Sequence, residues 1–237
     1  MDRWQETIAE NLSSAAVPGF KKQDVSFEAV QAGHHHVTAA PGSSANGSVW
    51  MQTGHPATNF QPGEFRTTNV KTDLAIDGKA FFEVQLPNGS SAFTRDGEFQ
   101  VSSTGQLVTK EGYTVMGDSG PIQLDLNNHT ELSISATGEV SQGTDLKGRI
   151  RLTEFNKPQA LTRISGGYFA ATSNEPGATP ATSSTVRQGM LEAANTSVVR
   201  EMANLMVAMR TFEANQRMAQ LHDDRMGRAI TDLTATS

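Results

Sequence analysis

The sequence of 237 residues contains no cysteine, and this absence excludes several kinds of site. Without thiols the chain has no disulfides, zinc ribbons, iron–sulfur clusters or cysteine nucleophiles. Aromatic residues make up only 6% of the chain, so we expect a small and mainly aliphatic core. The length allows one large domain or two modest ones.

Basic residues are in the minority and long apolar runs are missing. Lys and Arg number 19 against 25 Asp and Glu, a formal net charge of −6, which disfavours binding to nucleic-acid phosphates. No run approaches the roughly 20 apolar residues that span a bilayer, so membrane insertion is not expected. The first residues lack the basic and apolar regions of a secretory signal, and we expect no cleaved signal peptide.

Motifs that carry chemistry are weak. The three adjacent histidines at 34–36 diverge along the chain, whereas metal ligands need a spacing that brings them to one face, so a solvated loop is favoured over a metal site. The turn at 117–120 is one residue short of a nucleophile elbow, and the segment 125–136 lacks the Gly and Glu of a calcium loop. We therefore expect no catalytic residues, cofactor, metal or small-molecule substrate.

The N-terminal segment predicts a short helix followed by a connector. Trp4, Ile8 and Leu12 recur every four residues and form one apolar stripe, which Pro18-Gly19 stops, and Phe20 follows as an anchor. We assign residues 1–20 to an N-terminal helical segment. Residues 21–71 are polar and rich in Gly, Ser and Pro, and are expected to form an extended linker.

A period of two and frequent turn signals characterise residues 72–175. Turns recur about every 8–12 residues, a pattern typical of an all-β sandwich or small barrel-like domain. Asp96-Gly97 predicts a hairpin between the strands on either side, with Arg95 on the surface beside the turn. A second linker is expected at 176–187.

The last segment, 188–237, predicts a long helix with a coiled-coil seam. Its seam residues alternate spacings of four and three over five heptads, and most are apolar. They are Val198, Met202, Leu205, Met209, Phe212, Gln216, Ala219, Asp223, Met226, Ile230 and Leu233. The helix expected at 197–233 would be roughly 55 Å long, against roughly 24 Å for an N-terminal helix of 16 residues. Other molecules must therefore cover part of the seam.

Three blocks of the sequence resemble one family. The first runs from Ile8 to Lys21 and has the form I-A-x-N-L followed by G-F-K. The second joins 73–84 with 93–99 and 105–109, and the third runs from Gln188 to Asn195 and on to Arg210-x-Phe212-Glu213. In this order the blocks resemble bacterial flagellar rod and hook proteins, and the proximal-rod type is favoured over a distal-rod or hook-like subunit.

The resemblance implies a structural subunit with an α+β fold. Long terminal helices would pair as a coiled coil in the inner layer of a tubular axial structure, and the all-β middle domain would form an outer layer. Partners would be other copies, other rod and hook proteins and the flagellar type III export apparatus. The location would be the basal-body rod in the periplasm, where self-assembled subunits transmit torque for motility.

We expect the assembly interface to use apolar residues from both chain ends: Ile8, Leu12, Phe20, Val198, Met202, Leu205, Met209, Phe212, Met226 and Ile230. A secreted β-domain adhesin or binding module with a helical oligomerisation stalk is the alternative. Circular dichroism of the isolated chain separates the two, because the adhesin hypothesis requires the C-terminal helix to be fully folded in the monomer. A hydrolase is disfavoured because no nucleophile–base pair can be named.

Overall fold

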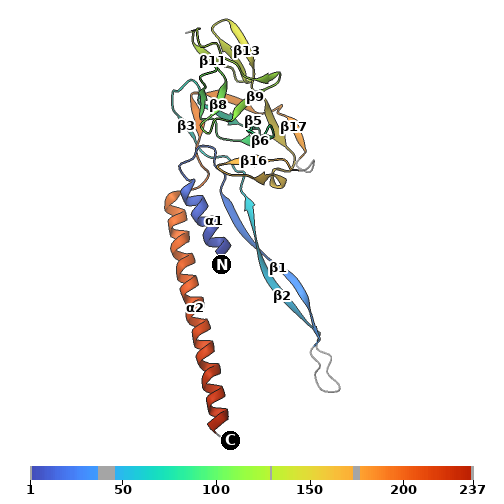
Figure 1. Ribbon diagram of the computed structural model, residues 1–237, viewed down its shortest axis with the longest axis vertical. Helices are drawn as coiled ribbons and strands as arrows, with labels where there is room; N and C mark the ends of the chain where they lie inside the picture. Colours follow the sequence, from blue (N-terminus) through green and yellow to red (C-terminus); the bar gives the residue numbers. More distant parts are fainter. Residues whose placement is uncertain (1, 37–45, 129, 173–176, 236–237) are drawn as a thin grey trace. The chain divides into compact units, whose positions relative to one another are not determined.

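The computed structural model describes residues 2–36, 46–128, 130–172 and 177–235. Over these ranges the chain is mostly β, with two α-helices (Figure 1). It divides into two compact units. We call Met1–Leu12, Gln23–Ala57 and Val198–Ser237 the helix–hairpin unit, and Ser13–Lys22 with Thr58–Ser197 the β unit.

The helix–hairpin unit contains α1 (Asp2–Ser13), β1 (Gln23–His36), β2 (Asn46–Thr58) and α2 (Val198–Ala235). In α1 the side chains of Thr7, Ile8 and Asn11 are buried, because four- and three-residue spacings place them on one face. The Asn11 amide fixes the start of β1. Its Nδ2 donates to the carbonyl oxygen of Gln23 at 2.8 Å, and its Oδ1 accepts from the Gln23 N–H at 2.9 Å.

Two features of the N-terminal region differ from the sequence-based expectation. The helix ends at Ser13, and the chain then turns, with Gly19 in the left-handed region at φ 66°. The expected linker at 21–71 contains the β1–β2 ribbon and the short strand β3 (Phe65–Thr67). A two-stranded ribbon pairs its backbone groups with each other, so it can form from a polar sequence that supplies no apolar core.

The β unit contains the remaining strands and one short 3₁₀ helix, η1 (Pro158–Ala160). The strands are β4 (Leu74–Asp77), β5 (Phe81–Gln85), β6 (Ser91–Thr94), β7 (Phe99–Val101), β8 (Leu107–Thr109), β9 (Thr114–Gly117), β10 (Gly120–Pro121), β11 (Leu132–Ile134), β12 (Glu139–Gln142), β13 (Asp145–Arg149), β14 (Leu152–Phe155), β15 (Thr162–Arg163), β16 (Tyr168–Ala170), β17 (Ala178–Pro180), β18 (Thr185–Gln188) and β19 (Met190–Glu192).

Strand β5 is central to the largest sheet, whose order is β15-β16-β6-β5-β9-β8-β7. It pairs antiparallel with β6, β9 and β14, with Phe82 opposite Thr94 of β6 and Leu152 of β14. Strands β11, β12 and β13 form a separate three-stranded sheet, and the pairs β18–β4 and β19–β3 form two small sheets. These last two pairs connect the segment before α2 to the first strands of the unit.

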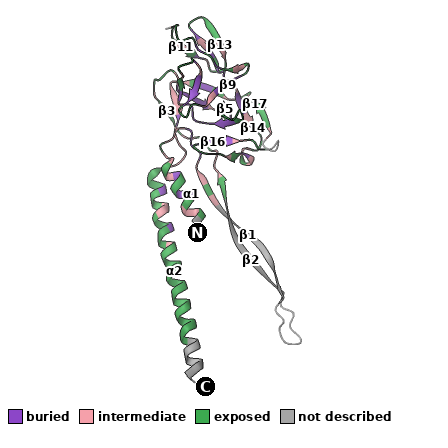
Figure 2. Cartoon of the chain, viewed as in Figure 1, coloured by how far each residue is buried: buried purple, intermediate pink, exposed green. Residues whose placement is uncertain are grey.

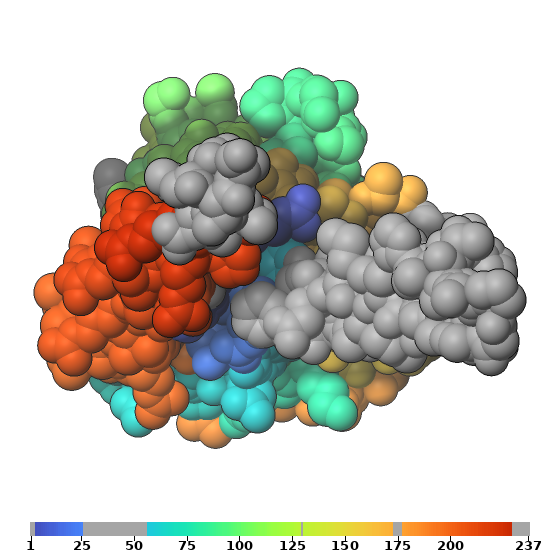
Figure 3. All heavy atoms as spheres, turned by 90° about the horizontal axis from the view of Figure 1, so that it is seen from below, coloured from blue at the N-terminus to red at the C-terminus, as the bar shows by residue number. Residues whose placement is uncertain are grey.

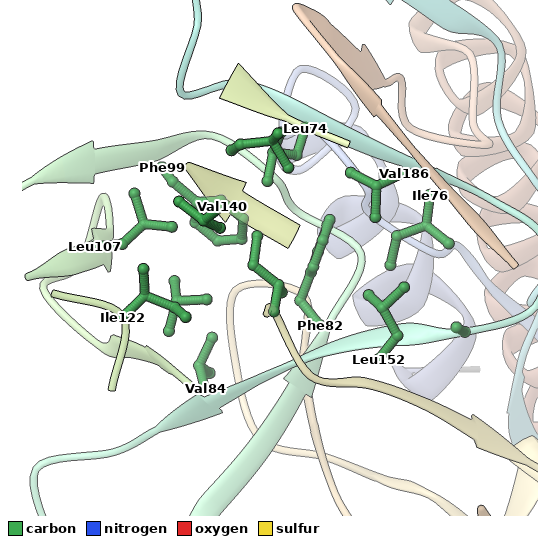
Figure 4. Packing of buried hydrophobic residues seen from close by; sticks show 14 of the residues in the cluster. Leu74, Ile76, Phe82, Val84, Phe99, Leu107, Ile122, Val140, Leu152 and Val186 are labelled. Atoms are coloured by element: carbon green, nitrogen blue, oxygen red, sulfur yellow. The ribbon is translucent and has the colours of Figure 1, made fainter. Parts of the chain in front are cut away.

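The core of the β unit has an aliphatic part and an aromatic part. Residues such as Ile76, Phe82 and Val140 from several sheets point toward one another in the larger cluster (Figure 4). The second cluster is built around four buried phenylalanines and Leu161, with Phe60 packed against it. Edge-to-face contacts such as Phe93–Phe155, at 4.8 Å between ring centroids, hold these rings together. The expectation of a mainly aliphatic core therefore describes only the larger cluster.

The hairpin expected at Asp96-Gly97 does not form. Strand β6 pairs with β5 and β16, whereas β7 pairs with β8. The Asp96 carboxylate accepts a hydrogen bond from the Glu98 N–H at 2.9 Å, and Leu74 N–H donates to the Gly97 carbonyl oxygen at 3.0 Å. A Cβ on Gly97 would lie 1.7 Å from the Leu74 oxygen. Glycine is needed at position 97 because the backbone there lies against the backbone of Leu74 in β4, and not because it forms a two-residue hairpin turn.

Regular structure also extends beyond the expected limits near the C-terminus. The segment 176–187, expected to be a linker, contributes β17 to β14 and β18 to β4. The segment 188–237 begins with β19 before α2 starts at Val198. These strands are edge additions of three or four residues, too short to show a clear alternation in the sequence.

Candidate functional site

A buried glutamate, Glu192 at the end of β19, is the centre of an ion-pair cluster in the β unit. Its Oε1 lies 2.5 Å from Lys21 Nζ, and both side chains are fully buried. Its Oε2 lies 3.3 Å from Arg95 Nη1, and Arg95 is only 4% exposed. Oε1 also accepts the Gly63 N–H at 2.8 Å. Both oxygens are thus occupied by donors from distant parts of the sequence.

The two cations of the cluster make further hydrogen bonds to backbone oxygens. Lys21 Nζ donates to the Gln61 carbonyl oxygen at 2.9 Å, and Arg95 Nη2 donates to that of Gly78 at 2.6 Å. Burial lowers the pKa of Lys21, and the adjacent Glu192 carboxylate opposes this shift. The pKa of Arg95 is lowered for the same reason and is likewise supported by Glu192. The Glu192 carboxylate therefore contacts both buried cations, and Glu154 adds a second favourable negative charge for Arg95.

Backbone contacts bring the same segments together beside the cluster. Gly19 N–H donates to the Glu192 carbonyl oxygen at 2.7 Å, and a Cβ on Gly19 would lie 2.2 Å from the carbonyl carbon of Arg95. Asn195 Oδ1 accepts the Lys22 N–H at 2.7 Å, and its Nδ2 donates to the Asn59 carbonyl oxygen at 2.7 Å. The chain leaving α1 and the chain approaching α2 are therefore fastened to each other within the β unit.

Sequence reasoning missed this cluster. Arg95, expected at the surface, is buried because its guanidinium has the Glu192 carboxylate and backbone oxygens as partners. One signal was present: Lys21, Arg95 and Glu192 each lie in a different one of the three blocks that carry the family resemblance. Charged residues in separated motifs can mark a shared contact, but the sequence contains nothing that says which of them pair.

Helix α2 has a covered face only in its first half. Glu201 and Ala208 are buried, and Leu205 between them is half-buried. From Phe212 to Arg228 every residue is exposed (Figure 2). Atoms of α2, orange to red, form a large part of the surface seen in Figure 3. A helical segment with one apolar stripe is poorly stable alone, which makes this exposed face the candidate binding surface of α2.

The residues expected at the assembly interface have different surroundings in the structure. Ile8 and Phe20 are buried within the chain, and the Phe20 ring packs under the Arg163 guanidinium, 4.7 Å from its centroid. Leu12 and Leu205 are half-buried. Five residues are exposed: Val198, Met202, Met209, Phe212 and Met226. The side chain of Ile230 lies outside the described residues.

The coiled coil of two long terminal helices is not what the structure shows. Helix α1 has 12 residues and α2 has 38, which correspond to about 18 Å and about 57 Å. Since a coiled coil requires two helices along the whole seam, α1 cannot be the partner for most of α2. The seam of α2 was recognised from its heptads, whereas its partner was assigned from the resemblance.

Two other kinds of site, a metal centre and a membrane span, are not found among the described residues. No three His, Asp or Glu side chains in this part of the chain are arranged to hold a metal ion. No helix found there is long and apolar enough to cross a membrane. The histidines at 34–36 lie at the end of β1, and their side chains are outside the described residues.

Comparison with known proteins finds matches to the region that contains Arg95 and to the region that contains Glu192 and most of α2. Residues 75–142 match the flagellar hook protein FlgE/F/G D1 domain, and residues 187–232 match the C-terminal domain of the flagellar basal body rod FlgEFG proteins. The flagellar basal-body rod protein FlgG of Borreliella burgdorferi is 33% identical over an alignment of 240 positions, which covers 94% of this chain and 90% of the relative. The chain belongs to the flagellar hook and basal-body rod family.

Other relatives in this family carry the name FlgF. The flagellar basal-body rod protein FlgF of Caulobacter vibrioides is 33% identical, covering 90% of this chain and 84% of its own length. The flagellar basal-body rod protein FlgF of Escherichia coli is 29% identical, and the alignment covers 95% of this chain and 90% of its own length. The match at 187–232 contains Glu192 and almost all of α2, so the buried cluster and the exposed helix both lie in family regions of this rod-family chain.

Proposed function

We propose that this chain is a non-enzymatic structural subunit of the bacterial flagellar basal-body rod. It would assemble with other copies of itself and with other rod and hook proteins into a tubular axial structure that transmits torque. The relatives named as basal-body rod proteins support the rod, and no feature of the described residues requires a catalytic role. We assign it to the proximal rod because of its compact length and its similarity to FlgF proteins along most of the chain.

The single observation that carries this proposal is the uncovered seam of α2. Met202 and Met209 are each more than half exposed although they occupy heptad positions. Methionine side chains adapt to varied apolar partners, which suits an interface between subunits. Fully burying an exposed side chain of this size contributes roughly 1.5–3 kcal/mol, and these half-exposed methionines would gain about half of that at every subunit of a polymer.

Delivery and location follow from the same proposal. A rod subunit functions in the periplasmic part of the basal body, and we propose that the flagellar type III export apparatus delivers it without signal cleavage. A segment that becomes ordered only against neighbours is compatible with passage as an unfolded chain, since the entropy cost is met at assembly.

The experiment is a paired substitution on the seam. Met202→Asp with Met209→Asp should leave the β unit folded, as judged by circular dichroism, and abolish rod assembly and motility in cells that lack the wild-type chain. Ala203→Asp with Ala214→Asp is the matched control, because it adds the same charge at exposed positions off the seam. Normal motility of the seam variant would show that the seam is not the assembly surface.

A further inference from the structure

Methionine is the only sulfur-containing residue type in this chain, because the sequence has no cysteine. Five of the nine methionines lie on α2, and all five side chains are more than half exposed: Met202, Met206, Met209, Met218 and Met226. Met116 in β9 and Met190 in β19 are half-buried. Among the side chains that the structure describes, solvent-accessible sulfur is therefore concentrated on one helix.

Three of these methionines lie side by side on the helix surface. Met202, Met206 and Met209 are separated by four and then three residues, the spacings at which helical side chains are neighbours. With 3.6 residues per turn, they fall within an arc of roughly 60° around the helix axis. We call these three residues the methionine patch. Met218 lies about 160° around the helix from Met202 and is outside the patch.

The methionine thioether reacts with two-electron oxidants such as hydrogen peroxide. The sulfur lone pair attacks one peroxide oxygen, so that an S–O bond forms while the O–O bond breaks. The departing hydroxide takes the proton of the transferred oxygen and becomes water. Sulfur loses two electrons to the peroxide, and the product is methionine sulfoxide. Because the oxidant must reach the sulfur, the exposed methionines should react before the half-buried ones.

Sulfoxide formation changes the character of the patch. The modification converts a flexible apolar side chain into a polar one, and it disrupts methionine-rich interfaces. Burying the new oxygen without a hydrogen-bond donor costs free energy, whereas burying the thioether does not carry this penalty. Three sulfoxides within one narrow arc would therefore replace the apolar start of the α2 stripe by a polar surface.

We propose that the methionine patch is a redox modification site, at which peroxides oxidise Met202, Met206 and Met209 to sulfoxides in the chain before it assembles. The modification keeps the oxidised chain out of rods, a consequence that rests on the proposed function. It is reversible, because methionine sulfoxide reductases return the sulfur to the thioether. Two thiols supply the electrons for this step, and the oxygen leaves as water. The patch thus makes the entry of new subunits sensitive to oxidants.

Peptide mapping of the purified full-length chain tests the site itself. The protein is treated with hydrogen peroxide for increasing times, unfolded and digested with trypsin. Cleavage after Arg200 and Arg210 places the whole patch on the peptide 201–210, whereas Met116 and Met190 fall on other peptides. Each sulfoxide adds the mass of one oxygen atom. We expect the patch to be oxidised several-fold faster than Met116 and Met190, and equal rates would overturn the proposal.

The change in polarity is measured on the same samples by hydrophobic-interaction chromatography. The oxidised chain should elute earlier than the untreated chain, because its surface is less apolar. Treatment with a dithiol and the two reductases, one for each sulfoxide epimer, should restore the original elution. An unchanged elution of the chain with a fully oxidised patch would contradict the proposal.

Matched leucine variants test the consequence in cells, because leucine is close to methionine in volume and has no sulfur to oxidise. The triple variant Met202→Leu, Met206→Leu and Met209→Leu removes the patch sulfurs, and Met218→Leu removes an exposed sulfur outside the patch. Each chain is induced in cells that lack it, with and without a sublethal peroxide pulse. The motile fraction is divided by that of the same strain without peroxide. This ratio should fall for the wild-type chain and for Met218→Leu, and should be preserved for the triple variant.

Equal losses in all three strains would refute the proposal. Where the triple variant forms no rods even without peroxide, the wild-type chain is tested in cells with and without excess methionine sulfoxide reductase. Absence of rescue by the reductase then refutes the proposal. The proposed function fails separately, if the wild-type chain does not enter rods in untreated cells, whereas the order of oxidation in the peptide map does not depend on that function.

Discussion

Replacement of Glu192 by glutamine should strongly destabilise the β unit. The substitution keeps the size of the side chain and removes the carboxylate that contacts both Lys21 and Arg95 in the buried cluster. Breaking a buried ion pair by removing one partner costs about 3–5 kcal/mol, because the remaining charge stays buried without compensation. For a unit of this size that loss lowers the melting temperature by roughly 10 °C.

A surface pair of the same length supplies the matched control. Lys71 Nζ and Glu131 Oε1 are also 2.5 Å apart, but these two side chains are 59% and 71% exposed. Lys71 holds the pKa of Glu131 below its usual value, yet exposed ion pairs contribute little to stability because water and salt screen them. Glu131→Gln should therefore change the unfolding free energy far less than Glu192→Gln does.

The assay is urea denaturation of the full-length variants, in which unfolding is monitored by circular dichroism and by tyrosine fluorescence. Both tyrosines, Tyr113 and Tyr168, lie in the β unit and report on it. Adding Lys21→Met to Glu192→Gln should recover part of the loss, because one unpaired cation is removed. Equal effects of Glu192→Gln and Glu131→Gln would refute the reasoning, since burial would then not distinguish the two pairs.

Three further predictions concern neighbouring residues. Gly19→Ala should destabilise the β unit by more than Gly89→Ala in thermal unfolding, because both have positive φ but only at Gly19 would the Cβ lie 2.2 Å from a backbone carbon. Burial raises the pKa of Asp96 to about 7. Between pH ~4 and about 7 the Asp96 carboxyl therefore keeps its proton in the folded protein but loses it in the unfolded chain. Stability should therefore fall as the pH rises from about 4 to about 7, by up to about 4 kcal/mol, and Asp96→Asn should remove this part of the pH profile measured by urea denaturation. Asn195→Asp should destabilise the chain at least as much as Asn195→Ala in the same assay, because the carboxylate would face the two carbonyl oxygens that the amide now binds.

Features set by local pattern were predictable from the sequence. Heptad spacing and the absence of proline placed the C-terminal helix at 197–233, and α2 spans Val198–Ala235. Turns were expected to recur through residues 72–175, and two glycines in that region, Gly89 and Gly105, both have φ 82°, a conformation that side chains disfavour. In each case the decisive information lies within a few residues.

Features set by distant contacts were not predictable. Lys21 and Glu192 are 171 residues apart, and Arg95 and Glu192 are 97 apart, so no local pattern indicates that these charges become buried together. The hairpin expected at Asp96-Gly97 failed for a similar reason, because Gly97 passes close to Leu74 of another strand. The β1–β2 ribbon was missed because its polar composition resembles that of a linker, although a ribbon needs only mutual backbone pairing.

The buried cluster fixes the segment that leads into α2. The residues just before α2 are the ones that the β unit fixes: Glu192 by two cations, and Asn195 by backbone groups on Lys22 and Asn59. Both residues are thus held by hydrogen bonds within the β unit, and those of Glu192 are buried and charge-assisted. If this anchorage serves transmission as well as folding, a variant weakened only at Asn195 should still assemble but should support slower swimming in viscous medium. Wild-type swimming of assembled Asn195→Ala rods under load would show that the anchorage serves folding alone.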